Sequence, residues 1–391
     1  MIVSLYSVRP NALADRPSAW TLLLSPQDWR TPELLGRWED LLQVCGNLNA
    51  MYQSPQWWEC LQSPESGQRL SIALLQDRAG PPIGIAPLSV ERHALQFHFS
   101  GHVLGTIGLQ AVFVMGGQPI LPPEQKHHDD FFAALAMGFP DCQGIALPAV
   151  PVDGFLWRYL HCSPAIQDRF LLHMPEGIEQ CHTCALPASF EQYLAKFNAK
   201  RRYNLKRQVK ILRGHGGGKL ELRRIESRDD LPVFLEAIEA VAPPSSNAYE
   251  LTLNQRKYSW YAEWADRGLL RCYTLKCGDD YVAWLRGYQY RGIYHLELTR
   301  YGKRFARFSP GTVLLHLVVE DLIRYKPMKM ISFGFGDPTY KHQSSNTSLR
   351  YARILLLRRS ILNRCLQMSH LSFRQLVNFA RMHVLTKKRL A

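Results

Sequence analysis

Residues 304–312 of this 391-residue chain place two arginines directly before a predicted helix. Ser309 suits the N-cap, Pro310 suits the first helical position, and Gly311 has no side chain that would block close approach. The N-terminus of a helix carries roughly half a positive charge, so free N–H groups near 311–313 could hold a pyrophosphate or a carboxylate. The alternative is that the run only begins a helix. The candidate ligands for such an anion are Arg304, Arg307, Ser309, Gly311 and Thr312.

A second basic segment lies at 189–213, where the apolar spacing and the pair Ser189 and Gln192 predict one long helix. Arg202 and Lys206 share one face of this helix with the basic residues at 210 and 213, while apolar residues occupy another. Arg202 and Lys206 are therefore candidates for binding a phosphorylated ligand. A charge run of this kind can equally be a solvated face.

The two halves of the chain differ in charge. Residues 1–180 contain 10 Lys and Arg against 17 Asp and Glu, and residues 181–391 contain 37 against 16. The net charges of −7 and +21 together give the +14 of the whole chain. The second half is therefore expected to meet something anionic, such as nucleic acid, lipid headgroups or a phosphorylated substrate.

The nine cysteines do not predict a metal centre. Their odd number and wide scatter favour reduced thiols over a disulfide framework. Cys181 and Cys184 have zinc-like spacing, but no second pair follows at the spacing of a zinc finger. We expect no metal and no permanently bound cofactor.

The elements that must position these groups form two α/β units in tandem. Strands and helices alternate up to about 180, an aperiodic stretch with two prolines at 174–188 predicts the junction, and the order then repeats. In the second unit, three antiparallel strands at 269–299 are expected to lead into a helix at 310–325. The predicted domains are 1–180, 181–358 and a basic amphipathic helical tail at 359–391.

Composition limits the class of protein. With 46% hydrophobic and 20% charged residues the chain should fold as a globular protein, and its length favours two or three domains. Its apolar runs fall far short of the ~20 residues of a membrane-spanning helix. The first residues lack the pattern of a secretory signal, so we expect a cytoplasmic protein.

Five segments, in this order, resemble motifs of the CelD/BcsL group of acetyltransferases, which belongs to the GNAT superfamily and is related to the Fem-type peptidyltransferases. The motifs are Tyr52-Gln53-Ser54-Pro55-Gln56-Trp57, Ile83-Gly84-Ile85-Ala86-Pro87-Leu88, the basic run Lys200 to Arg207, the run Tyr301 to Thr312, and Gly336-Asp337 with Tyr340-Lys341. The resemblance covers roughly 50–357. Gly302 and Ser332 replace acidic residues of the family's pattern, and the Trp that often follows Tyr-Lys is missing.

The resemblance implies two tandem GNAT-like domains with mixed central sheets, and acyl transfer from a thioester such as acyl-CoA to an amine or hydroxyl. Acyl-CoA would act as a co-substrate and rest on the helix that begins at Ser309. The acceptor, a sugar or amine from cell-envelope or exopolysaccharide biosynthesis, would enter a groove between the domains lined in part by Trp57 and the basic helix.

The segment 336–341 supplies further candidates, because a position just past the end of a strand commonly faces the ligand crevice of an α/β sheet. Lys341 could stabilise the oxyanion of the tetrahedral intermediate, and Tyr340 could protonate the leaving thiolate. Glu297 and Asp337 are the candidate general bases. As alternatives, Tyr340 packs and Lys341 is solvated.

Two other functions remain open at this point. A Fem-like transferase would take its acyl group from aminoacyl-tRNA and use the basic surface for RNA. A non-catalytic accessory protein would bind a membrane or synthase partner through the tail at 359–391, which can lie on an anionic membrane surface or dock on its own domain. A tail that lies on the membrane surface would place the protein peripherally at the inner face of the membrane.

Overall fold

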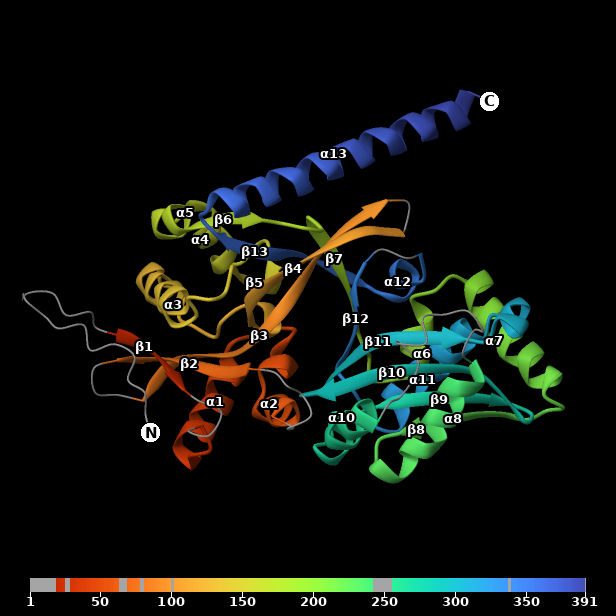
Figure 1. The fold of residues 1–391 in the computed structure, drawn as a ribbon. Helices are drawn as coiled ribbons and strands as arrows, with labels where there is room; N and C mark the ends of the chain where they lie inside the picture. The colour runs from red at the N-terminus through yellow and green to blue at the C-terminus, as the bar shows by residue number, and fades with distance from the viewer. Residues whose placement is uncertain are drawn as a thin grey trace, which may run out of the picture. The chain divides into compact units, whose positions relative to one another are not determined.

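The computed structural model describes residues 19–24, 29–62, 69–77, 81–99, 102–241, 255–336 and 339–390. Contacts between residues divide the chain into two units, Met1–Glu179 with Arg350–Ala391, and Gln180–Leu349. Both units are mixed α/β structures, as predicted (Figure 1). Each is described by itself below.

The first unit is built on a mixed sheet with strand order β1-β2-β3-β4-β5-β13, and β6 also pairs with β13. Its strands are β1 (Ala19–Leu24), β2 (Arg69–Asp77), β3 (Pro82–Phe99), β4 (His102–Val114), β5 (Gly144–Pro151), β6 (Phe170–His173) and β13 (Thr347–Arg358). β4 and β5 run parallel, and the other pairs run antiparallel. Because β13 pairs with β5 and β6, residues 350–358 belong to this unit by their contacts.

Helices cover the sheet of the first unit. They are α1 (Pro32–Val44), α2 (Pro55–Leu61), α3 (Gln125–Gly138), α4 (Phe155–Cys162), α5 (Pro164–Arg169) and α13 (Ile361–Leu390). Phe131, Phe132 and Leu135 of α3 are buried with Val112 and Leu147 of the sheet in one apolar cluster. α13 confirms the predicted helical tail, and between 361 and 380 it packs on this unit.

The second unit has a mixed sheet in the order β7-β12-β11-β10-β9-β8. The strands are β7 (Ile178–Ala185), β8 (Leu220–Ile225), β9 (Cys272–Cys277), β10 (Asp280–Tyr290), β11 (Ile293–Tyr301) and β12 (Met330–Phe335). β9, β10 and β11 form the expected antiparallel meander, and β11 then pairs in parallel with β12.

The helices of the second unit divide between the two faces of its sheet. They are α6 (Phe190–Ala195), α7 (Ala199–His215), α8 (Leu231–Val241), α10 (Gln255–Asp266), α11 (Pro310–Arg324) and α12 (Thr339–Ser344). Successive side chains of a strand point to opposite faces, so Leu285 of β10 packs with α7 and α11, whereas Trp284 contacts Phe234 of α8. The face that carries α8 and α10 also carries the cavity described below.

One strand was not predicted, and one predicted helix is divided. The stretch 174–188, predicted as the junction from its prolines and its lack of periodicity, contains β7, which pairs antiparallel with β12 and buries Cys181 and Cys184. Strand formation there follows from tertiary pairing rather than from local propensity. The helix predicted at 189–213 is two helices, since the side chain of Asn198 accepts a hydrogen bond from the Arg201 amide and begins α7 separately.

Candidate functional site

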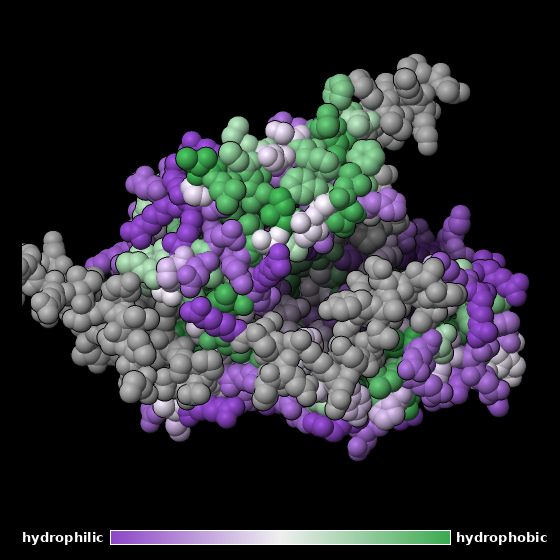
Figure 2. Space-filling view, in the orientation of Figure 1, coloured by the Kyte–Doolittle hydropathy of each residue, from purple (hydrophilic) through white to green (hydrophobic). Residues whose placement is uncertain are grey.

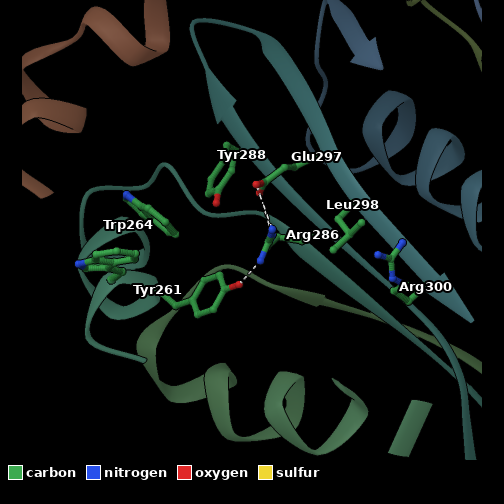
Figure 3. Close-up of a pocket in the computed structure, with 8 residues that line it drawn as sticks. Tyr261, Trp264, Arg286, Tyr288, Glu297, Leu298 and Arg300 are labelled. Atoms are coloured by element: carbon green, nitrogen blue, oxygen red, sulfur yellow. Dashed lines mark hydrogen bonds and ion pairs between the residues drawn. The ribbon is translucent and has the colours of Figure 1, made fainter. Parts of the chain in front are cut away.

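A cavity of about 430 Å³ opens on the sheet face that carries α10, between that helix and strands β10 and β11 (Figure 3). Its lining residues are Trp260, Tyr261, Trp264, Arg286, Tyr288, Glu297, Leu298 and Arg300. This volume is within the range of small-molecule sites. Glu297, a candidate general base from the sequence, therefore lies at the wall of a cavity.

A β-bulge turns Glu297 towards the cavity. Arg286 lies opposite Leu298 in the β10–β11 ladder and Gly287 lies opposite Leu296, so Glu297 is the extra residue of β11 at that point. A bulge re-aims a side chain without ending the strand. Glu297 and Leu298 consequently both line the same cavity.

Arg286 holds the carboxylate of Glu297 through two contacts. Its Nε lies 2.7 Å from Oε2, and its Nη2 donates to Oε1 at 3.0 Å. Its remaining nitrogen, Nη1, donates to the hydroxyl of Tyr261 at 2.6 Å. Burial lowers the pKa of Arg286, but Tyr261 and Glu297 outweigh burial and raise it, so the guanidinium remains charged. The Glu297 carboxylate is thereby fixed in orientation (Figure 3).

Aromatic rings form the rest of the wall. Trp264 contacts Tyr288 edge-to-face at 5.1 Å between ring centroids and Tyr261 at 5.6 Å. Burial raises the pKa of Tyr261 to about 12, so its hydroxyl stays protonated at neutral pH. The sequence motifs did not indicate these residues, although the alternation of Trp284, Arg286 and Tyr288 along one strand places the three on one face.

The helix α11 begins at Pro310 with Ser309 as its N-cap, as predicted, but the capping differs from expectation. Ser309 has left-handed backbone angles (φ 53°, ψ 49°) and its side chain makes no capping hydrogen bond. Its carbonyl instead accepts from the amides of Thr312 and Val313, so two of the three N–H groups expected to face outwards are already used. A non-glycine residue in this conformation costs about 1–3 kcal/mol.

The two predicted arginines lie in the 3₁₀ helix Lys303–Phe308 just before α11. Arg304 pairs with Asp280 at 2.6 Å, whereas the guanidinium of Arg307 lies 4.6 Å from the ring of Phe308. That ring stacks on His215, the last residue of α7, at 4.4 Å. The basic helix and the start of α11 are therefore neighbours, with Arg307 exposed beside them.

The strands β11 and β12 pair only at their beginnings. The parallel ladder joins residues 293–295 to 330–332, and no pairing follows, although β11 continues to Tyr301 and β12 to Phe335. Glu297 lies in the part of β11 that does not pair with β12, and a Cβ on Gly311 would lie 3.4 Å from the ring of Tyr301 at the end of that part. The four residue steps from Glu297 to Tyr301 span roughly 13 Å, which leaves room for an extended linker.

The segment after β12 gives one of its predicted catalytic residues a structural contact. Lys341 is buried and donates a hydrogen bond to the carbonyl of Phe335, so its ammonium group fixes the end of β12. Tyr340 is exposed on α12, and partial burial of its hydroxyl raises its pKa. Asp337 lies outside the described residues. The catalytic roles of all three stay predictions.

Two further predicted residues have structural contacts. Arg202 donates from Nη1 to the carbonyl of Phe197 at 2.5 Å, while Lys206 is exposed on α7. Trp57 packs edge-to-face on Tyr52 in the first unit, at 4.9 Å between ring centroids. The groove between the domains also stays a prediction. No three His, Cys, Asp or Glu side chains of the described ranges are grouped as a metal would require.

Comparison with known proteins finds a family match within the second unit. Residues 199–342 match the family described as an acetyltransferase (GNAT) domain, which confirms the predicted GNAT-type transferase. The match spans the cavity, the bulge and the start of α11. No curated protein matches this sequence.

Solved structures extend the likeness to most of the chain. FemX is similar with 9% identity and a TM-score of 0.57, over 85% of this chain and 98% of FemX. A tandem GNAT protein from the clavulanic acid biosynthesis pathway has 12% identity and a TM-score of 0.53, over 87% and 98% of the two chains. A conserved protein of unknown function from Bacteroides thetaiotaomicron has 9% identity and a TM-score of 0.51, over 85% and 100%. These likenesses confirm the tandem GNAT-like fold, while membership of the CelD/BcsL group stays a prediction.

Proposed function

We propose that the second unit transfers an acyl group from a thioester, with acyl-CoA as the donor, to an amine or hydroxyl bound in the cavity around Glu297. The length of β11 that does not pair with β12 carries the proposal, because it connects the carboxylate at the bulge to the basic, strained start of α11. The donor's phosphates would lie beside Arg307 and Gly311. Its extended arm would follow β11 to the cavity.

In the proposed reaction, the acceptor's nitrogen or oxygen attacks the thioester carbonyl while Glu297 takes the proton that the acceptor loses. The carbon–sulfur bond then breaks, and the thiolate takes a proton from Tyr340. Arg286 keeps the Glu297 carboxylate aimed into the cavity through the two contacts described above. Lys341 would act on the oxyanion only after release from the Phe335 carbonyl.

Glu297→Gln tests the proposal because it keeps the side chain's shape and removes its proton acceptor. We expect kcat for thioester consumption with a panel of acyl-CoA donors to fall by roughly 10²–10⁴. Glu239→Gln, at an exposed position of α8, is the matched control and should be neutral. Full activity of Glu297→Gln would remove Glu297 as the base, and failure of every acyl-CoA to bind at millimolar concentration would remove the donor.

The cavity also favours a class of acceptor. Aromatic walls beside an arginine–carboxylate pair suit the apolar faces and hydroxyl groups of a sugar ring, and Arg300 adds a positive charge at the rim. We therefore propose a sugar or amino-sugar precursor of the cell envelope or an exopolysaccharide as the acceptor, at the cytoplasmic face of the membrane.

A Fem-like transfer from aminoacyl-tRNA is the second candidate. The exposed basic residues of α7 lie beside the 3₁₀ helix that carries Lys303, Arg304 and Arg307, which gives RNA a continuous positive surface. Salt discriminates between the two donors. Binding of RNA should weaken log-linearly and steeply with salt concentration, whereas binding of acyl-CoA, with few phosphates, should respond less.

A further inference from the structure

The inner face of α13 packs on the first unit, and its outer face exposes apolar side chains. The inner face packs through Leu366, His370, Phe373 and Val377, with Phe97 of β3 lying 5.1 Å from His370 and 5.3 Å from Phe373. Ile361, on the opposite side, is 86% exposed and Leu376 is 67% exposed. The outer apolar residues are Ile361, Met368, Leu371, Leu376 and Phe379, and Leu362 is also exposed at the start of the helix.

The tip of the β3–β4 hairpin adds apolar residues next to this helix. Phe99 follows Phe97 on the sheet face that α13 covers, and Ile107 lies opposite the buried Leu95 on that same face. Phe99 and Ile107 are nevertheless exposed, as are Val103 and Leu104 at the turn. The outer apolar residues of α13 together with Phe99, Val103, Leu104 and Ile107 of the hairpin form the apolar region that we term the α13–hairpin surface. Figure 2 shows hydrophobic residues gathered over α13.

The charge around this surface identifies its partner. Residues 359–391 contain seven basic residues and no acidic one, and residues 92–108 also lack acidic residues. The basic residues of the tail are Arg359, Arg364, Arg374, Arg381, Lys387, Lys388 and Arg389. Arg364 is exposed among the outer apolar residues, whereas Arg359 and Arg374 donate to the carbonyls of Gln167 and Met174. Exposed apolar residues on a helix in a strongly basic tail are typical of a helix that lies in the interface of an anionic bilayer.

A second copy of the chain fits the same face less well. A two-helix coiled coil needs apolar residues at alternate spacings of three and four, and from Ile361 that spacing reaches Ser372 and Gln375. A coiled coil also leaves no place for the apolar hairpin tip. A lipid surface has no such register requirement and accommodates both elements.

We propose that the α13–hairpin surface docks the first unit on an anionic lipid bilayer, with both elements inserted at the level of the headgroups. The inference extends the expected membrane contact of the tail to a second element, and it does not depend on acyl transfer. No helix within the described residues has the length and hydropathy needed to cross a bilayer, so docking would be peripheral.

Flotation of the full-length protein with vesicles tests the proposal. Wild type should float with vesicles of phosphatidylcholine and phosphatidylglycerol and stay unbound with phosphatidylcholine alone. Met368→Glu with Leu376→Glu, and separately Phe99→Asp with Leu104→Asp, should each reduce the bound fraction roughly tenfold or more. Val44→Glu, at an exposed apolar position of α1, is the matched control and should float as wild type.

Three outcomes would overturn the proposal. They are no flotation of wild type with the anionic vesicles, unchanged flotation of the α13 or the hairpin variant, and a wild-type dimer that Leu376→Glu converts to a monomer. Thermal melts of the variants check that they fold, which is expected because the altered side chains are exposed. Thioester consumption with a soluble acceptor should be the same in all of them, so failure of docking is distinguishable from failure of the acyltransferase proposal.

Discussion

At the scale of single residues, the chemistry of the candidate site depends on the pair Arg286 and Glu297. The sequence offered Glu297, in a predicted strand, as one of two candidate general bases. It did not indicate Arg286, because the two side chains meet only where Glu297 is the extra residue of β11, opposite Arg286 and Gly287 of β10. A bulge inserts one residue into a regular alternation, and nothing in the local sequence specifies it.

Gly311→Ala separates donor binding from folding. An added Cβ would meet only the Tyr301 ring at 3.4 Å, which is ordinary contact, and alanine favours helix over glycine by about 1 kcal/mol. Stability should therefore be unchanged or slightly higher. If the donor's phosphate approaches this amide, KM for acyl-CoA should rise roughly tenfold with little change in kcat.

The control for Gly311→Ala is Gly36→Ala, where a Cβ on α1 meets nothing within 4 Å. It should raise stability in the same way and leave KM unchanged. An unaltered KM in both variants would place the donor elsewhere.

The buried side chain of His173 should make the folded protein less stable in acid. Its side chain is buried 5.0 Å from the ring of His370, and burial, with lesser effects of His370 and Arg374, lowers its pKa to about 4. The unfolded chain, with a pKa near 6.5, therefore takes up this proton first as pH falls. Stability is complete above about pH 6.5 and should decrease by up to about 3 kcal/mol as pH falls towards 4.

Urea denaturation between pH 7.5 and 4.5 measures this dependence. His173→Phe should flatten the profile, because an aromatic ring without a titrating group fills the same space. His161→Phe, at an exposed histidine of α4, should leave the profile unchanged. Equal pH profiles for wild type and His173→Phe would show that other groups govern acid sensitivity.

At the scale of elements, the sequence predicted those helices and strands whose bounds depend on nearby residues. The start of α11 was predicted at Pro310, and the meander of β9, β10 and β11 was expected, since turn residues and apolar alternation determine both. The strand β7 was missed because its partner β12 lies about 150 residues further along the chain. The capping of α11 by a left-handed Ser309 was also beyond local prediction, because strain depends on surrounding packing.

A buried ion pair holds α11 against the sheet and gives a prediction at this scale. Asp321 of α11 accepts from Arg271 at 2.8 Å and from the hydroxyl of Tyr273 at 2.7 Å, and the Arg271 side chain has no exposed surface. Asp321→Ala would leave a buried guanidinium without its main counter-charge. We expect a loss of about 3–5 kcal/mol in the free energy of unfolding.

Glu320→Ala is the matched control on the same helix. Glu320 pairs with Arg324 at 3.1 Å near the surface, and such a pair contributes at most about 0.5 kcal/mol. Chemical denaturation of the two variants measures the difference. Similar losses for both would mean that the Arg271 network does not stabilise α11.

At the scale of the whole molecule, the tandem fold was predictable because each half repeats an alternation of strands and helices. The prediction placed residues 350–358 with the second half, since they follow it in sequence. The structure pairs them with β5 and β6, which lie some 200 residues earlier in the chain. Local sequence patterns do not indicate that the chain returns to the sheet of the first unit.

Each unit has its own apolar cluster, and this separation predicts where a core substitution acts. Leu147 of β5 belongs to the cluster of the first unit and Leu322 of α11 to that of the second, and both side chains are fully buried. Leu→Ala at either position should cost about 2–5 kcal/mol. Hydrogen exchange followed by mass spectrometry should show lost protection within 29–179 and 350–380 for Leu147→Ala, and within 180–349 for Leu322→Ala. Equal loss in both units from either variant would mean that the two clusters unfold as one cooperative structure, since exchange then occurs only through global opening.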